Sequence, residues 1–237
     1  MEPFFQCSGT CPICVSEVIF SSHNSWFRDN LICNNCGSIP RERALMVAIE
    51  KFAPNWRSCV IHESSPAARG TSQRLKKEAP RYIETQFFFG KIPGSMVRGF
   101  RNENLENMTF ANNRIDLHIT QDVMEHVFDV DKAFAEIART LKSGGMHIFT
   151  VPIVQQAGIP TVKRAEFTNG KEIHLLEPVY HGNPVSQEGS LVVYDWGYDI
   201  VQRIYEASKM HTIVLQMDDI SRGIKAEYID VLISVKG

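Results

Sequence analysis

Apolar residues follow two alternating patterns along most of the chain. Short apolar runs bounded by turn residues predict buried strands, and apolar residues three or four apart predict helices. The strands are expected at 59–63, 81–86, 115–120 and 146–151, and the helices at 67–77 and 131–141, with a turn at 142–145. Strands that alternate with helices indicate a parallel sheet covered by helices on both faces. Its carboxyl edge is then the expected place for a ligand.

The flanking segments complete this α/β pattern. An amphipathic helix is predicted at 42–52, another helix at 199–208, and closing strands at 212–216 and 227–235. Residues 152–196 contain four prolines and several glycines, which predicts a long loop region over the sheet edge. Long ordered loops in compact domains often form lids or substrate walls.

Two Cys-x-x-Cys pairs lie near the N-terminus, with 18 residues between them. The four cysteines are Cys11, Cys14, Cys33 and Cys36. Such spacing predicts a closed tetrahedral site of the kind that structural Zn²⁺ occupies, and two disulfides are the alternative. Cys7 either replaces one ligand or takes no part. Cys59 stands in an apolar run and is expected to be buried as a small hydrophobe.

Composition and charge narrow the class of protein. The 237 residues are 43% hydrophobic and 22% charged, which suits one sizeable soluble domain with a small accessory module. We expect a zinc-binding module at 1–40 and the main domain at 41–237, with 152–196 as its lid. No apolar run is long enough to span a membrane and no signal peptide is evident, so we expect no membrane association and a cytoplasmic location.

A net charge of −2 argues against a protein that mainly grips nucleic acid phosphates. Several basic residues do lie in or near the cysteine module, mixed with acidic ones, and this mixture predicts a solvated helix face. The basic residues are Arg28, Arg41, Arg43 and Lys51, and the acidic ones are Glu42 and Glu50.

The order of the elements and three motifs carry a resemblance. After the strand at 115–120 come Asp122-Val-Met-Glu125-His126-Val127, then Glu136-Ile-Ala-Arg-Thr-Leu-Lys-Ser-Gly-Gly145, then Thr150-Val-Pro152. Together they resemble the class I S-adenosylmethionine-dependent methyltransferases, in the small-molecule branch that contains the ubiquinone-pathway O-methyltransferases. The resemblance covers 58–152 and implies a Rossmann-like sheet with an antiparallel closing strand. The cysteine module lies outside it.

The resemblance implies where the cofactor, S-adenosyl-L-methionine, binds. The family ends its first strand with an acidic residue and a glycine-rich turn, and the turn lets the backbone approach the cofactor. Here Glu63 keeps the acidic position and is followed by Ser64. Ser65 and Ala67 stand where glycines are usual, and Gly70 lies near the third. Ser65 is also placed to cap the following helix. A plain capped turn without a ligand is the alternative.

Further cofactor contacts are implied along the same edge of the sheet. Gln86, or Glu84 two residues earlier, stands where the family grips the ribose hydroxyls. Asn104 takes the position of the acidic residue that meets the adenine amine, and Leu105 supplies a backbone N–H and an apolar wall. Gln121 is expected to face the methionine part of the cofactor, as is Asp122.

Methyl transfer to a hydroxyl requires removal of a proton, so histidines near the sheet edge are candidate bases. His181 is the first candidate because it lies among polar and turn residues inside the predicted lid. His126 is second, with Asp122 as an orienting partner. His174 is third, because His174-Leu175 resembles a pair that lines the acceptor pocket in the family. Structural roles for these histidines are the alternative.

The predicted function is methylation of an oxygen or nitrogen of a small-molecule acceptor, a sugar or secondary metabolite. An RNA methyltransferase with an N-terminal zinc module is the first alternative, although the acidic balance argues against nucleic acid. A non-catalytic binding protein with a methyltransferase fold is the second, because two glycines are replaced. The zinc module either packs on the catalytic domain as a lid or mediates a homodimer.

Overall fold

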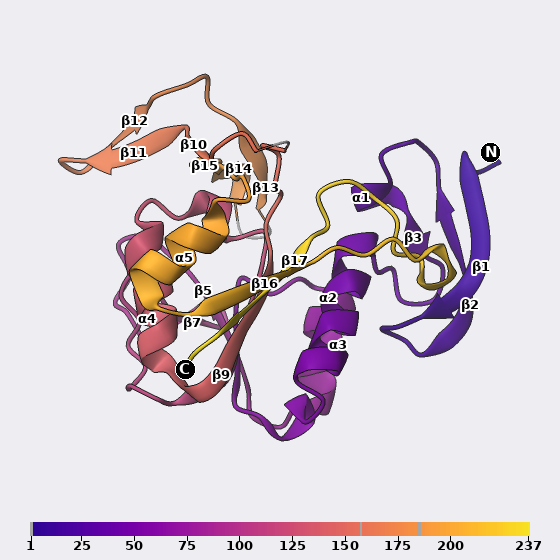
Figure 1. The fold of residues 1–237 in the computed structure, drawn as a ribbon, viewed down its shortest axis with the longest axis horizontal. Coiled ribbons are helices and arrows are strands. Elements are labelled where there is room, and N and C mark those ends of the chain that lie inside the picture. Colours follow the sequence, from indigo (N-terminus) through magenta and orange to yellow (C-terminus); the bar gives the residue numbers. More distant parts are fainter. Residues whose placement is uncertain (1, 157, 184–185) are drawn as a thin grey trace.

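A central sheet of eight strands forms the body of the molecule (Figure 1), in the order β16-β17-β9-β8-β4-β5-β7-β6. The structure is a computed structural model that describes residues 2–156, 158–183 and 186–237. The sheet strands are β4 (Ile61–Ser64), β5 (Tyr82–Gln86), β6 (Met96–Val97), β7 (Phe100–Asn102), β8 (Ile115–Gln121), β9 (Leu141–Thr150), β16 (His211–Leu215) and β17 (Val231–Val235). Of these described strands, only β6 and β17 run against their neighbours. This confirms the predicted Rossmann-like sheet with an antiparallel closing strand.

Helices cover both faces of this sheet because alternate strand residues point to opposite sides. On one face, α2 (Pro40–Phe52) and α3 (Gly70–Glu78) pack on Ile61, Ile119 and Ile148. On the other, α4 (Val130–Thr140) and α5 (Ile200–Ser208) pack on Phe149 and Leu232. Short 3-10 turns lie at η1 (Trp56–Ser58), η2 (Met124–His126) and η3 (Ile220–Arg222). No described helix is long and apolar enough to cross a membrane.

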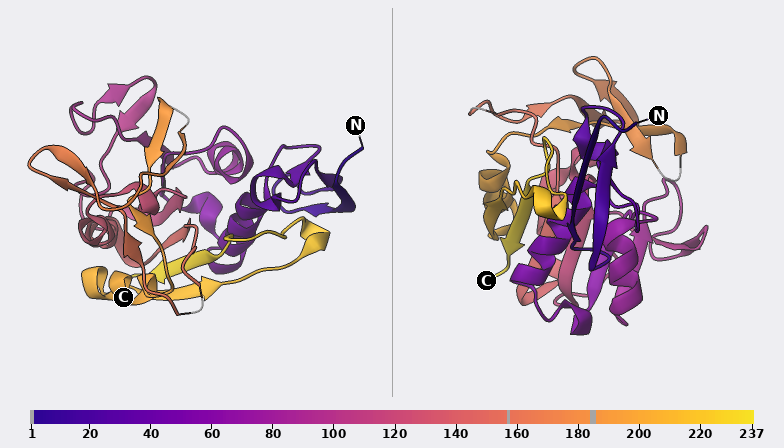
Figure 2. Two further views of the ribbon diagram at one scale, coloured as in Figure 1. Left: turned by 90° about the horizontal axis from the view of Figure 1, so that it is seen from above. Right: turned by 90° about the vertical axis from the view of Figure 1, so that its right-hand side faces the viewer.

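The N-terminal module is a small antiparallel sheet of β1 (Phe5–Cys11), β2 (Ser16–Ser22) and β3 (Ile32–Cys33). The single-turn helix α1 (Phe27–Asn30) connects β2 to β3. Figure 2 shows the C-terminal segment around η3 running alongside β1. Gly9 allows this approach, because a Cβ there would lie 2.0 Å from the carbonyl oxygen of Ser221. The module's apolar residues join those of α2 and the sheet in one buried cluster. The module therefore packs directly on the main domain.

Residues 152–196 contain more regular structure than the loop that was predicted. Three strand pairs occur there: β10 (Val162–Lys163) with β15 (Tyr194–Asp195), β11 (Ala165–Thr168) with β12 (Lys171–His174), and β13 (Tyr180–Asn183) with β14 (Ser186–Leu191). The prolines and glycines of this region led to the prediction of a loop. The same residue types are also common in the turns of hairpins, so they do not exclude short strands. Figure 1 shows both hairpins above the upper end of the sheet, with β11–β12 farther from the N-terminal module than β13–β14.

One strand is longer than predicted. β9 begins at Leu141 and runs through 142–145, where a turn was expected. The glycines there do not end the strand, because the Gly144 N–H donates to the Lys236 carbonyl and the Lys236 N–H donates to Gly145. A Cβ on Gly145 would lie 2.8 Å from the Lys142 carbonyl oxygen. The glycines thus lie in a bulge of β9, between the pairs Ile115–Leu141 and Leu117–Met146, rather than at a turn that precedes the strand.

Candidate active site

A large open cleft of about 1870 Å³ lies at the carboxyl edge of the parallel strands. Three parts of the chain contribute its walls: the residues that follow β4, β5 and β8, the strand pairs of 152–196, and the N-terminal module. Ligands of open α/β sheets bind at this edge, where strands end and loops begin. The cleft therefore occupies the position that the sequence predicted for a ligand.

The turn after β4 lines the cleft through Ser64, Ser65 and Ala67. Ser65 adopts a positive φ of 56°, a conformation in which glycine is favoured and most other residues are strained. The turn has thus kept a glycine-like backbone although glycine is absent. Gly70 does not line the cleft. It begins α3 with φ at 61°, and a Cβ there would lie 2.2 Å from a Glu42 carboxylate oxygen.

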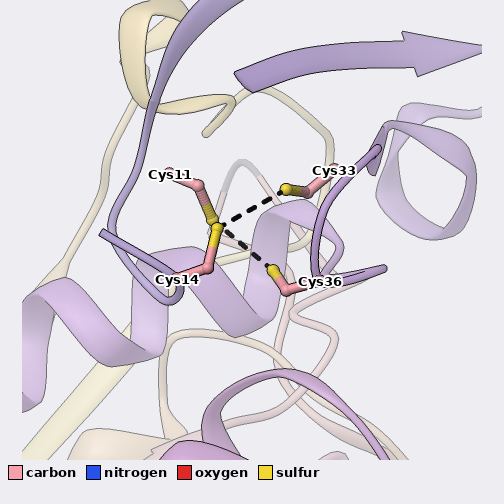
Figure 3. Close-up of side chains that lie close together, drawn as sticks. All are labelled: Cys11, Cys14, Cys33 and Cys36. Carbon is pink, nitrogen blue, oxygen red and sulfur yellow. Dashed lines mark hydrogen bonds between the residues drawn. The ribbon is translucent and has the colours of Figure 1, made fainter. Parts of the chain in front are cut away.

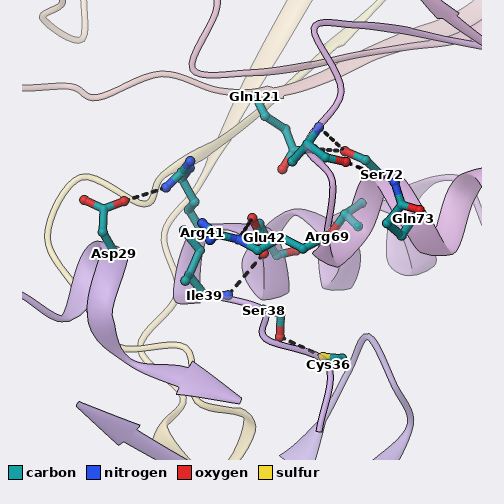
Figure 4. A network of polar contacts seen from close by, with 12 residues as sticks. Asp29, Cys36, Ser38, Ile39, Arg41, Glu42, Arg69, Ser72, Gln73 and Gln121 are labelled. Carbon is teal, nitrogen blue, oxygen red and sulfur yellow. Dashed lines mark hydrogen bonds and ion pairs between the residues drawn. The ribbon is translucent and has the colours of Figure 1, made fainter. Parts of the chain in front are cut away.

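Glu42 holds this turn from the side of α2. Its buried carboxylate accepts hydrogen bonds from the Ile39 backbone N–H at 3.1 Å and from Arg69 at 2.9 Å. The Thr71 hydroxyl donates to the Glu42 carbonyl at 2.6 Å. Figure 4 shows Glu42 and Arg69 in contact between the two helices. The helix that follows the cysteine module therefore fixes the start of α3 next to the cleft.

Glu63 is fully buried and lies behind the cleft wall rather than on it. Its carboxylate accepts hydrogen bonds from Ser72 at 2.6 Å, Tyr82 at 2.7 Å and Gln121 at 2.7 Å. Burial raises the pKa of this carboxyl, and the three hydrogen bonds only partly oppose that. Glu63 thus ties β4, β5, β8 and α3 together at the strand ends, and it reaches a ligand only through these partners.

The other predicted cofactor residues divide into two groups. Gln86, Asn104, Leu105 and Gln121 all line the cleft. Glu84 does not, since its carboxylate binds Lys76 at 2.8 Å on the outside of the molecule. Of the two candidates for the ribose hydroxyls, the structure therefore places Gln86 on the cleft.

Asp122 connects the cleft to the N-terminal module. Its carboxylate accepts from Arg28 of α1 at 2.7 Å and lies 3.0 Å from Nε of Arg41, the second residue of α2. Burial would raise the pKa of this carboxyl, but the two arginines outweigh it and lower the pKa to about 2. Arg41 also pairs with Asp29 at 2.8 Å (Figure 4).

These contacts correct the prediction of a solvated basic face. Arg28 and Arg41 are largely buried against Asp122. Arg43 is fully buried and donates to the carbonyls of Leu31 at 2.8 Å, Gly223 at 2.7 Å and Ser38. Burial lowers the pKa of Arg43 to about 10, and the nearby cysteines oppose this shift. The basic residues thus join the module to the rest of the protein.

Two of the three candidate histidines meet at the cleft, together with Glu125. His126 lies in η2 and His181 in β13, and their rings pack edge to face at 5.3 Å. His126 Nε2 is 3.8 Å from Glu125 Oε1, and His181 Nδ1 is 3.7 Å from the same oxygen. His174 lies apart, exposed on β12 and outside the cleft lining. Glu125, His126 and His181 are called the Glu125 cluster below.

The four predicted metal-binding cysteines converge in the N-terminal module, as Figure 3 shows. All their sulfur atoms lie within 4.8 Å of one another. Cys11 and Cys36 are 3.7 Å apart, and Cys14 and Cys33 are 4.0 Å apart. Sulfurs about 2.3 Å from a tetrahedral zinc ion are about 3.8 Å apart, so the spacing fits Zn²⁺. The thiols are free rather than paired as disulfides, and Cys59 is buried as expected.

Comparison of the chain with protein families and solved structures indicates the kind of reaction that the cleft supports. Residues 62–149 match the family described as a methyltransferase domain. This segment of the chain is therefore similar to methyltransferase domains. The match runs from β4 to β9 and so includes the turn at Ser65, Asp122 and the Glu125–His126 pair. Together with the fold, this match supports a class I methyltransferase and an enzyme. A search of curated proteins finds no match to the chain.

Solved structures share the fold of this domain at low sequence identity. An S-adenosylmethionine-dependent methyltransferase from Mesorhizobium loti is 12% identical, with a TM-score of 0.51 over 81% of this chain and 96% of that chain. Streptomyces venezuelae DesVI is 9% identical, with a TM-score of 0.52 over 84% and 91%. The glycopeptide N-methyltransferase MtfA, complexed with S-adenosyl-L-homocysteine, is 11% identical, with a TM-score of 0.51 over 81% and 86%.

Sequence reasoning missed three side chains next to the cleft. In the sequence, Glu125 was recognised only as part of a motif. No sequence pattern indicated that its carboxylate is buried beside two histidines. Arg28 and Arg41 were assigned to solvent because acidic residues surround them in the sequence. One sequence feature could have indicated their burial. Arg28 lies between the two cysteine pairs and Arg41 lies at the start of a helix, where the module would contact the main domain.

Proposed function

We propose that this protein transfers a methyl group from S-adenosyl-L-methionine to an oxygen or nitrogen of a small-molecule acceptor. The carrying observation is the cleft at the carboxyl edge of the sheet, where the methyltransferase-domain match, the left-handed Ser65 turn and the Glu125 cluster meet. MtfA, an N-methyltransferase of similar fold, supports an acceptor of this class. The thiol ligand set favours a reducing compartment, and we propose the cytoplasm.

The residues of this chain fit the cofactor. At Ser65 the backbone takes the conformation that glycine gives the family, so it can approach a ligand closely. Gln86 offers an amide oxygen toward ribose hydroxyls, and Asn104 and Leu105 lie on the cleft for the adenine. Gln121 donates to Glu63, which leaves its own amide oxygen toward the cleft as an acceptor for an ammonium group. Asp122 adds a carboxylate held ionised by Arg28 and Arg41.

When bound, the cofactor supplies an electrophilic methyl carbon: the acceptor atom bonds to it while the carbon–sulfur bond breaks and its electron pair stays on sulfur. The protein's own residues align the acceptor and remove its proton. The Glu125 cluster is the polar centre of the cleft on the side of the strand pairs. It takes the proton from the acceptor and passes it to solvent through the half-exposed His181. The strand pairs of 152–196 form the wall of the cleft beside this centre.

For the four cysteines we propose one structural Zn²⁺ ion. Cys11 and Cys33 are buried, and the sulfurs surround a closed position without an open coordination site. Arg43, directly beside the cysteines, supplies a positive charge that balances part of the negative charge of four thiolates. The ion then orders a module at 1–40 that holds Arg28 against Asp122, while residues 41–237 form the catalytic domain.

Binding of S-adenosyl-L-homocysteine tests the proposed cofactor site. We expect the unmodified protein to bind it by isothermal calorimetry. Ser65→Gly should bind equally well, because glycine adopts a positive φ freely. Ser65→Val should bind at least about tenfold more weakly, because a β-branched residue strains this conformation and moves the turn. Melting temperatures of both variants check that the fold is retained. No heat and no thermal shift with the unmodified protein would favour a non-catalytic binding protein instead.

Replacement of His181 tests the proposed role of the Glu125 cluster. We expect His181→Ala to lower methyl transfer to a hydroxyl acceptor by about 100-fold or more, the usual loss for an acid–base group. The affinity for S-adenosyl-L-homocysteine should change less than about threefold, because the cluster serves the acceptor. Transfer is measured with radiolabelled methyl donor against a panel of sugars and phenols. Equal losses of turnover and cofactor affinity would contradict a role in catalysis, and His211→Ala on β16 is the control.

A further inference from the structure

Among the residues that the structure describes, the Glu125 cluster has a buried carboxylate whose oxygens make no hydrogen bond. Glu125 has no solvent exposure. Within 2–156, 158–183 and 186–237, neither of its carboxylate oxygens has a hydrogen-bond partner. The nearest cluster nitrogens, at 3.7 and 3.8 Å, are beyond hydrogen-bond distance. A buried ionised carboxylate without a partner costs several kcal/mol, so such a group calls for a compensating charge.

The two histidines already have the orientation that a metal ligand needs. His126 Nδ1 lies 2.8 Å from the Leu191 carbonyl oxygen. A carbonyl can only accept, so Nδ1 carries the proton and a neutral His126 presents the Nε2 lone pair to Glu125. A ring nitrogen that donates to a backbone carbonyl while the other faces the metal is the usual arrangement of histidine ligands. His181 brings Nδ1 to the same point from β13.

From this geometry we infer that the Glu125 cluster binds a divalent first-row metal ion, separate from the four-cysteine site. Its ligands are one Glu125 oxygen, His126 Nε2 and His181 Nδ1. Their atoms all lie within 4.8 Å of one another. Ligands about 2.1 Å from a tetrahedral ion are about 3.4 Å apart. The two distances from Glu125 to the histidines, 3.7 and 3.8 Å, thus require a contraction of only a few tenths of an ångström.

Asp122 does not belong to this ligand set. Although it lies only three residues before Glu125, its carboxylate is held by Arg28, Arg41 and the Thr150 hydroxyl. Three protein ligands leave at least one coordination position open, which is typical of catalytic rather than structural sites. His126 and His181 line the cleft, so the open position faces the acceptor.

The chemistry of the ion follows from its place, and this part rests on the proposed methyl transfer. Two imidazoles and one carboxylate suit Zn²⁺, Fe²⁺ or Mn²⁺ rather than Mg²⁺ or Ca²⁺. The open coordination position of such an ion would take an acceptor hydroxyl oxygen, and the ion would lower the pKa of that hydroxyl. With the ion bound, the lowered pKa of the hydroxyl would replace proton removal by the free histidines, and the proton would pass to solvent at the cleft mouth. The acceptor class is therefore a hydroxyl compound, and an adjacent second oxygen would chelate the same ion.

Metal binding is tested without any acceptor. The full-length protein is purified with its cysteine site filled by zinc, and Zn²⁺ or Mn²⁺ is titrated by calorimetry. Bound metal per chain is counted by mass spectrometry. We expect one additional ion per chain from at least one of the two metals. Glu125→Gln keeps the shape of the side chain and should weaken this binding at least about tenfold, because it removes the only anionic ligand.

Two further variants keep the test decisive. His181→Ala changes a half-exposed side chain, so it reports on the ion even if Glu125→Gln fails to fold. His211→Ala is the control and should bind the additional ion normally. The inference is overturned if the unmodified protein takes up neither ion beyond the cysteine-bound zinc, or if both cluster variants bind it unchanged. Titration of S-adenosyl-L-homocysteine, done separately, shows whether the proposed function fails on its own.

Discussion

Replacing Cys14 with serine is expected to release the metal ion of the N-terminal module and to destabilise the whole protein. Metal affinity in such sites is coupled to folding, so the loss of one ligand lowers the free energy of unfolding by about 4 kcal/mol or more. For a chain of this size that corresponds to a fall in melting temperature of about 10 °C or more. The effect extends beyond the module because Cys11 and Cys33 belong to the same buried cluster as α2 and the sheet.

The measurement is zinc content and melting temperature of purified Cys14→Ser. Cys7→Ser is a matched control, because Cys7 lies in β1 of the same module but outside the four-sulfur cluster. It should keep its zinc and melt within a few degrees of the unmodified protein. A Cys14→Ser protein with full zinc content and an unchanged melting curve would refute the structural metal site.

The sheet was predictable because its main strands carry β-branched and other apolar residues and alternate along the chain with helices. The predicted strand at 115–120 lies within β8, and the helix predicted at 131–141 is displaced from α4 by one residue. Helix α3 begins at Gly70, three residues later than predicted. Ala67 has a backbone N–H that donates to the Ser72 hydroxyl, and this bond closes the preceding turn outside the helix.

The candidate site was only partly predictable because its contacts join distant segments. Arg28 and Asp122 are 94 residues apart in the sequence, and a single chain without its fold gives no sign that they pair. His181 lies beside Glu125 because it belongs to β13, a strand in the region that was predicted to be a loop. Serine at 65 hid a glycine-like turn, since positive φ is a property of the folded backbone. Local periodicity cannot show any of these contacts.

Three buried histidines make the fold sensitive to acid. His62, His118 and His147 stand side by side on β4, β8 and β9. His62 and His118 share a hydrogen bond of 2.7 Å between their Nδ1 atoms. Burial lowers the pKa of His62 and of His147 to about 3, and that of His118 well below its usual 6.5. At neutral pH all three are therefore uncharged, and they are compatible with an apolar core.

The direction of the pH effect follows from proton uptake. Between pH 6.5 and about 3 the unfolded chain protonates these histidines and the folded chain does not. Stability is therefore fully present above pH 6.5 and is lost as the pH falls, by about 1.4 kcal/mol per pH unit for each histidine. Burial also raises the pKa of Glu63, which acts in the opposite direction above pH 4.5. We expect the three histidines to outweigh this single carboxyl, so unfolding in denaturant should become easier from pH 7 to pH 5.

A single substitution isolates the contribution of one histidine. His147 contacts the Thr120 hydroxyl at 3.0 Å and stacks on Phe149, so His147→Gln keeps a polar partner for Thr120 but removes the titrating group. The fall in the free energy of unfolding between pH 7 and pH 5 should become smaller by about 2 kcal/mol. This difference is independent of any change that glutamine makes to stability at pH 7. The exposed His211→Ala variant is the control. If the fall is the same in His147→Gln as in the unmodified protein, His147 titrates equally in both states and its burial does not cause the acid sensitivity.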